Sequence, residues 1–339
     1  MYSGHIHTIL GGARLPKRVE YERELPPAED GNPICLDWLR TEKTPKGIVF
    51  VVPGLGNYSQ TPYIQRMSEE ACAMGFHICI MTVRGMGSAP LQVAKFASVT
   101  FTEDVRWTMK KYLQEANIKE KFGQALSIVA IGFSAGGSML TKAVAEEGAS
   151  GDGSVIPFRA VICVTAPYDM ETHSATMLSF MGKLLYQRPL MVALRRFAQK
   201  HKKLLMERQN VDEQTYDENV RGMMTLQDFE NAVVVPIFNY ANVHDYYRHG
   251  SSFQWIRQFP ATVPVVCTAS RDDIITGYGC TAEHWRDLIH HCHHAVYVET
   301  PTGGHLGYVG TPLQEYRRES SFLYDFPLRC ALAFLSTTD

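Results

Sequence analysis

Five residues in the first half of the chain have the spacing that an activated serine requires. Gly132-Phe133-Ser134-Ala135-Gly136 follows an apolar run and precedes a predicted helix. The two glycines permit a tight strand-to-helix turn that lifts a serine above a sheet, and a helix N-terminus favours negative charge developing beside it. We therefore predict that Ser134 is a nucleophile. The alternative is a turn of small residues with no chemistry.

A serine nucleophile needs a neighbouring base to take its proton, and histidine is the usual one. Thr302-Gly303-Gly304-His305-Leu306-Gly307 follows the last predicted strand of the chain. The flanking glycines indicate a loop that can bring His305 to the carboxyl edge of a sheet. We predict that His305 is the general base, against the alternative of a surface histidine.

The base in turn needs an acid that fixes its tautomer and stabilises the imidazolium. Ser270-Arg271-Asp272-Asp273 follows an apolar run at 263–269, so two adjacent carboxylates stand where the acid is expected. Residue types alone do not separate Asp272 from Asp273, and either could pair with Arg271 instead.

Two backbone N–H groups should bind the oxyanion, one from the residue after the nucleophile and one from the loop after an early strand. Ala135 supplies the first, and Leu55, within Pro53-Gly54-Leu55-Gly56, is the expected second donor. The same glycines could belong to a dinucleotide-binding loop, but Ser59 occupies the third glycine position of that motif.

The elements that position these residues follow an alternation of strands and helices. Continuous apolar, β-branched runs indicate strands covered on both faces of a mostly parallel sheet. We predict such strands at 47–52, 76–83, 126–133, 160–165, 263–269 and 295–299. We predict an antiparallel edge pair at 18–24 and 34–40, and helices at 61–74, 102–121 and 319–335.

The alternation breaks once, between the predicted strands at 160–165 and 263–269. This interval is too long for a simple crossover, so we interpret it as an inserted helical cap. We predict core at 1–168, the cap at 169–258 and core again at 259–339. Between Lys183 and Arg208 the cap has eight basic residues and one acidic residue, interleaved with leucines at partly helical spacing. This pattern favours either a solvated basic face or peripheral contact with an anionic membrane.

Composition narrows the class of protein further. A net charge of -2 with 45% hydrophobic and 20% charged residues indicates a globular protein and gives no reason to expect nucleic acid as a partner. No signal peptide or membrane-spanning run is seen. We expect a cytoplasmic protein with reduced cysteines, which are scattered without a Cys-x-x-Cys pair: Cys35, Cys72, Cys79, Cys163, Cys267, Cys280, Cys292 and Cys330.

A histidine-rich segment, His290-His291-Cys292-His293-His294, could suggest a metal site. Adjacent side chains on one short segment do not readily close a four-ligand shell. We expect neither a metal nor an organic cofactor, and we interpret this segment as a polar lead-in to the last strand.

The chain resembles the α/β-hydrolase family that holds YheT-like esterases, yeast medium-chain ethyl ester synthase/esterases, plant embryogenesis-associated proteins and ABHD-type lipases for monoacylglycerol and phospholipid. The resemblance covers most of the chain and rests on residues 4–10, Asp30-Gly31, residues 36–38 and 53–56, Tyr63-Ile64, Arg84-Gly85, Gly87-Ser88, residues 132–137 and 246–248, Ser251-Ser252, Asp272-Asp273 and residues 303–307.

This resemblance implies a triad of Ser134, Asp273 and His305, because the family's acid is the second aspartate of its pair. The chain departs from the family at Ile274, where proline is usual, and at Asn239, where aspartate is common. Several relatives carry an N-terminal anchor, and some an acyltransferase box, His-x-x-x-x-Asp; neither is seen here.

The sequence as a whole predicts a serine hydrolase that cleaves carboxylic esters of small lipid-like molecules, monoacylglycerol or medium-chain esters, through an acyl-enzyme. An alcohol O-acyltransferase using the same acyl-enzyme is one alternative. A non-catalytic module that binds lipid or a protein partner is another.

Overall fold

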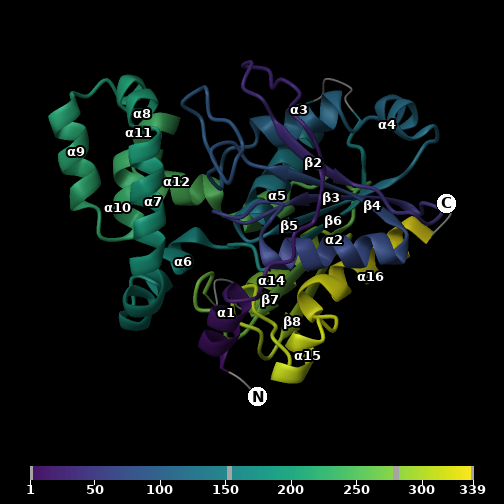
Figure 1. The fold of residues 1–339 in the computed structure, drawn as a ribbon. Helices are drawn as coiled ribbons and strands as arrows, with labels where there is room; N and C mark the ends of the chain where they lie inside the picture. The colour runs from purple at the N-terminus through teal and green to yellow at the C-terminus, as the bar shows by residue number, and fades with distance from the viewer. Residues whose placement is uncertain (1–2, 151–154, 278–281, 337–339) are drawn as a thin grey trace.

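One eight-stranded sheet organises the protein (Figure 1). The computed structural model describes residues 3–150, 155–277 and 282–336. The strand order is β1-β2-β4-β3-β5-β6-β7-β8. The bounds are β1 Glu22–Glu24, β2 Cys35–Leu39, β3 Gly47–Val52, β4 Phe76–Thr82, β5 Ile128–Phe133, β6 Phe158–Val164, β7 Val265–Ser270 and β8 Ala295–Thr300.

The sheet is parallel except at its first edge. β1 pairs antiparallel with β2 and β2 with β4, and the remaining neighbours from β4 to β8 are all parallel. Parallel strands end at the same edge, so β3, β5, β7 and β8 deliver their following loops to one side of the molecule. The predicted mostly parallel α/β sheet is confirmed, and so is the antiparallel pair at its edge.

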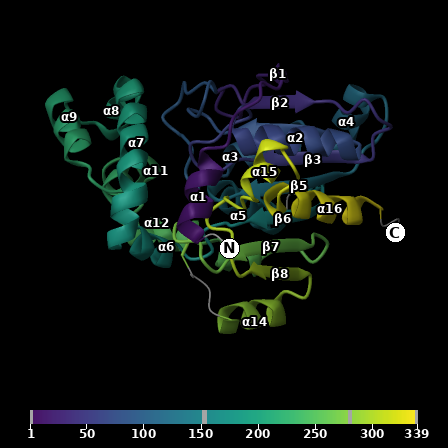
Figure 2. The same cartoon turned by 60° about the horizontal axis from the view of Figure 1, so that its bottom comes forward.

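Helices cover both faces of the sheet, which explains why the strands read as continuous apolar runs. Val49 and Val51 of β3 pack into one buried cluster with α2 (Pro62–Met74) and α16 (Phe322–Ser336). Phe50 and Val52 face the other cluster, which includes α5 (Ala135–Ala149). Figure 2 shows α2 and α16 together on their face of the sheet.

Two expectations for the helices need correction. The predicted helix at 102–121 is two helices, α3 (Glu103–Lys111) and α4 (Glu115–Phe122), because Leu113 turns into the core and Gln114 starts a new helix. In addition, α1 (Gly4–Gly12) and α15 (Pro312–Tyr316) are helices that the sequence patterns do not predict.

The interval between β6 and β7 is helical, and Figure 1 shows most of it standing beside the sheet. The domain boundaries themselves remain a prediction. The helices are α6 Met170–Met177, α7 Arg188–Lys200, α8 Lys202–Gln209, α9 Glu213–Gly222, α10 Leu226–Phe229, α11 Val235–Phe238, α12 Val243–Gly250 and α13 Ser252–Ile256, with π-helical turns η1 Gly182–Gln187 and η2 Glu230–Val234; α14 Ala282–His291 lies between β7 and β8.

Candidate active site

Ser134 lies at the turn between β5 and α5. Its φ of 50° and ψ of -125° are far from either element, and a non-glycine residue held at positive φ stores strain. The Ser134 N–H donates to the Val164 carbonyl at 2.9 Å, and the Ser134 carbonyl accepts from Gly137 at 2.8 Å. The surrounding hydrogen bonds therefore hold the serine in this turn, at the carboxyl edge of the sheet.

Glycines beside the serine let neighbouring backbone approach closely. A Cβ at Gly132 would lie 2.6 Å from Gly137 Cα, and one at Gly136 would lie 2.1 Å from the Val52 carbonyl oxygen. Real Cβ atoms do not approach backbone so closely. The N-terminus of α5 is thereby packed against the end of β3, where the loop that carries Leu55 begins.

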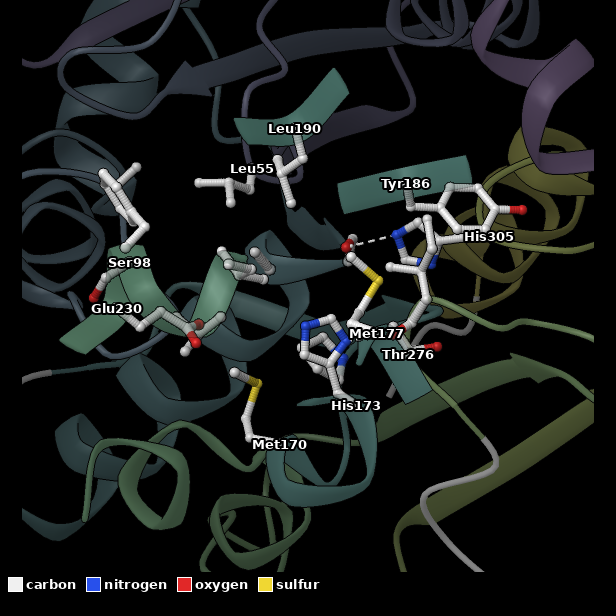
Figure 3. A pocket seen from close by; sticks show the side chains of 18 of the residues that line it. Leu55, Ser98, Met170, His173, Met177, Tyr186, Leu190, Glu230, Thr276 and His305 are labelled. Carbon is white, nitrogen blue, oxygen red and sulfur yellow. Dashed lines mark hydrogen bonds between the residues drawn. The ribbon is translucent and has the colours of Figure 1, made fainter. Parts of the chain in front are cut away.

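The structure brings Ser134, His305 and Asp273 into one hydrogen-bonded chain. Ser134 Oγ lies 2.9 Å from His305 Nε2, the contact drawn in Figure 3. His305 Nδ1 lies 2.8 Å from Asp273 Oδ2. A carboxylate accepts but does not donate, so Nδ1 carries the hydrogen and Nε2 is the acceptor for the serine hydroxyl.

Asp273 is held as a carboxylate although it is buried. Its Oδ1 accepts the N–H groups of Ile275 at 2.9 Å and Thr276 at 3.1 Å, and its Oδ2 accepts the Thr276 hydroxyl at 2.7 Å. Burial by itself would raise the pKa of Asp273, but His305 and these hydrogen bonds outweigh it and hold that pKa below its usual value.

Asp272 makes different hydrogen bonds from Asp273. The structure therefore distinguishes the two aspartates, which residue types alone did not. Asp272 Oδ1 accepts the N–H groups of Gly303 and Gly304, both at 2.9 Å, and the Ser270 hydroxyl at 2.7 Å. It thus anchors the loop that carries the histidine. Arg271, the other candidate partner for either aspartate, pairs with Glu299 instead.

The unpredicted helix α1 packs directly on the same loop. Thr8 Oγ1 accepts the His305 N–H at 2.8 Å, and His7 Nδ1 accepts the Val309 N–H at 3.1 Å. The Arg14 guanidinium donates to the Gly307 carbonyl at 2.7 Å. A Cβ at Gly304 would lie 2.2 Å from the Gly4 carbonyl oxygen, so helix and loop are in backbone contact.

The two expected oxyanion donors lie beside the serine. Ala135 is the first residue of α5, where backbone N–H groups have no partner inside the helix. The carbonyls of Gly54 and Leu55 accept from Asn57 at 3.0 and 3.1 Å. The Leu55 N–H therefore points away from Asn57, because N–H and C=O oppose each other across a trans peptide. Both residues line the cavity described next.

A cavity of about 560 Å³ opens on this site (Figure 3). Most of its wall is apolar, and nearly half of the residues that line it belong to the helices between β6 and β7. Ser134, His305, Leu55 and Ala135 contribute to the wall, as do Met170, Met177, Leu190, Phe229 and Tyr246.

Two polar residues of this wall were not singled out from the sequence, His173 on α6 and Glu230 on η2. No motif marks either one. Glu230 is buried and accepts the Tyr247 hydroxyl at 2.5 Å, and burial raises its pKa to about 8.

Other sequence features lie away from this site. His290 and His291 end α14, and the part of the chain that the structure describes has no cluster of three His, Cys, Asp or Glu positioned for a metal ion. Seven of the cysteines are free thiols, and Cys280 lies outside the described residues. Within the same residues, no helix is long and apolar enough to cross a bilayer.

The fold and the arrangement of the site define an α/β-hydrolase. The sequence model of the family Hydrolase_4, described as serine aminopeptidase S33, matches residues 43–241, and the chain belongs to this family.

Three relatives illustrate the family. The embryogenesis-associated protein EMB8 of Picea glauca is 25% identical and covers 91% of this chain, the putative esterase YheT of Escherichia coli is 26% identical over 86%, and the monoacylglycerol lipase of Saccharomyces cerevisiae is 24% identical over 78%. The matched regions are 66%, 78% and 55% of those proteins.

Solved structures show the same fold. A soluble variant of the S. cerevisiae monoglyceride lipase, with a substrate analogue, aligns with a TM-score of 0.54 at 15% identity over 97% of this chain and 98% of its own. A carboxyl esterase of Bacillus coagulans aligns with a TM-score of 0.52 at 14% identity, over 94% and 100%. These comparisons confirm the predicted α/β-hydrolase fold.

Proposed function

We propose that this protein is a serine esterase that cleaves carboxylic esters of lipid-like acyl groups through an acyl-enzyme. One observation carries the proposal: the hydrogen-bonded chain from Ser134 through His305 to Asp273 faces a largely apolar cavity. In this arrangement Asp273 orients the base and His305 activates the serine.

The proposed reaction has two steps. His305 Nε2 takes the proton of Ser134 as its Oγ attacks the ester carbonyl, and the N–H groups of Leu55 and Ala135 stabilise the oxyanion. The alcohol leaves with the proton from His305. Water, activated by the same histidine, then attacks the acyl-enzyme and releases the acid.

The wall of the cavity supports an aliphatic substrate. Methionine, leucine and phenylalanine side chains gain free energy by covering an acyl chain, and methionines adapt to chains of different shape. The relatives named above as an esterase and a monoacylglycerol lipase support the same substrate class. We propose monoacylglycerols and medium-chain esters as the first substrates to test.

Peripheral contact with a membrane is the second part of this proposal. Phe180 and Leu184, beside the cavity-lining Tyr186, are 78% and 44% exposed, and Lys183 and Arg188 next to them are exposed cations. Exposed apolar and basic residues together suit an anionic bilayer. Not every basic residue of this segment is available to a membrane, because Lys202 forms ion pairs with Glu213 and Asp217 of α9.

Fluorophosphonate labelling is the direct test of the nucleophile. We expect the wild type to be labelled and Ser134→Ala not to be, with kcat on p-nitrophenyl esters lowered by about 10⁶ in the variant. Esters of increasing acyl length then locate the optimum. A folded wild type that is not labelled would favour the non-catalytic binding module.

The same assays separate hydrolysis from transfer. With ethanol or glycerol added, an O-acyltransferase would form new ester from the acyl-enzyme, whereas a hydrolase releases free acid. The comparisons do not favour transfer. Vesicle sedimentation with anionic and neutral lipid tests the membrane contact, which Phe180→Ser with Leu184→Ser should weaken.

A further inference from the structure

His173 is a buried polar side chain in the wall of a largely apolar cavity. It belongs to α6, the first helix of the cap, which begins after the N-cap Asp169. The proposed reaction assigns it no role, although Figure 3 shows it between Glu230 and His305 in the cavity. Burying a polar group in such a place is costly unless it is hydrogen-bonded.

One nitrogen of this histidine is already used. Nδ1 makes a hydrogen bond with the Ile275 carbonyl, which can only accept, so Nδ1 carries the hydrogen. Burial lowers the pKa of His173 to about 4, so the ring is neutral at pH 7. Nε2 must then present a lone pair, and no described residue makes a hydrogen bond to it.

The contact with Ile275 places this lone pair near the reacting groups. Ile275 and Thr276 donate their backbone N–H groups to Asp273, so His173 is tied to the turn that holds the acid. Thr276 lines the same cavity as His173 and Ser134. When the ester carbonyl of a substrate lies against Ser134, the polar groups near that carbonyl lie in the same cavity as His173 Nε2.

We infer that His173 is a specificity-determining residue whose Nε2 accepts a hydrogen bond from a hydroxyl of the alcohol part of the ester, as in a glyceryl ester. A neutral hydroxyl suits the apolar surroundings, whereas an ammonium donor would lose its hydration there. This inference rests on the proposed esterase function. It predicts a preference for glyceryl over simple alkyl esters of the same acid.

The test compares kcat/KM for a 1-monoacylglycerol and for the ethyl ester of the same acyl chain. In His173→Asn the amide can keep the bond to Ile275 but does not reach the position of Nε2. We expect the glyceryl-to-ethyl ratio to fall about tenfold, the size of one lost hydrogen bond. His173→Gln can place an amide oxygen near the Nε2 position and should restore most of the ratio.

His244→Asn is the matched control, because His244 is an exposed cap histidine bound to Glu171. It should leave the ratio unchanged. His173→Phe is a second variant that also lacks the acceptor, and thermal unfolding checks that each variant is folded.

An unchanged ratio in His173→Asn and His173→Phe overturns the inference. So does an equal loss on both esters, which would mean that His173 positions water or supports the fold. If the wild type cleaves neither ester, the proposed function fails first. If it cleaves the ethyl ester with no preference for the glyceryl ester, only the inference fails.

Discussion

The contact between α1 and the histidine loop leads to a quantitative prediction for Thr8→Val. Valine has nearly the shape of threonine but has no oxygen to accept the His305 N–H, now bound at 2.8 Å. A buried N–H left without a partner costs about 1–3 kcal/mol. We expect the loop to relieve this cost by shifting away from α1, which would disturb the 2.9 Å contact between His305 Nε2 and Ser134 Oγ. We expect kcat/KM to fall about thirtyfold, equivalent to about 2 kcal/mol.

The assay is hydrolysis of a p-nitrophenyl ester, together with the rate of fluorophosphonate labelling, which reports the activation of Ser134 directly. Thr8→Ser keeps the hydroxyl and should retain near-normal values for both. Unfolding midpoints show whether the valine variant is intact. Turnover in Thr8→Val within twofold of the wild type would refute the reasoning, as would an equal loss in Thr8→Ser.

Three further predictions concern the acid, the cavity and the serine turn. Asp273→Asn should lower kcat by about 10⁴, because the amide favours the wrong tautomer of the base, whereas Asp272→Asn should cost far less; equal losses would contradict the separate tasks. The Glu230 carboxyl has the ordinary glutamate pKa of 4.5 in the unfolded chain and a pKa of about 8 in the folded protein, so folding stability should fall by roughly 1.4 kcal/mol per pH unit between those values. Urea unfolding should show that Glu230→Gln raises the free energy of unfolding, relative to the wild type, more at pH 8 than at pH 5. If this free energy varied with pH identically in the variant and the wild type, the result would count against a neutral buried acid. Gly136→Ala should destabilise the protein by roughly 3 kcal/mol or abolish labelling, since its Cβ would meet the Val52 carbonyl; a normal melting temperature with normal labelling would be inconsistent with this packing.

Much of the fold could be predicted because its signals are local. A strand covered on both faces must be apolar along its whole length, as in residues 47–52, and Gly132, Ser134 and Gly136 mark the turn that a nucleophile needs. His305 stands out because glycines flank it. These patterns depend on neighbours in the sequence, so they can be read without the structure.

The remaining features depend on contacts between distant segments. Asp272 and Asp273 have the same chemistry, and only the path of the loop decides that one meets the Gly303 N–H and the other His305. The helix α1 has weak helix signals of its own, with glycine at both ends, and packs against a loop from the far end of the chain. The role of His173 likewise follows from its contact with Ile275.

The contact between α1 and the histidine loop joins segments that are far apart in the sequence, and this has a consequence for the protein during its synthesis. During synthesis α1 and Ser134 emerge before β7 and β8, whereas the proposed acid and base, Asp273 and His305, lie on the loops that follow those two strands. Until those loops are made, α1 has no loop to hold and the serine has no base. Under the proposed mechanism, a nascent chain can fold its early strands without carrying an activated serine, and hydrolysis starts only after the histidine loop has been made and has packed against α1.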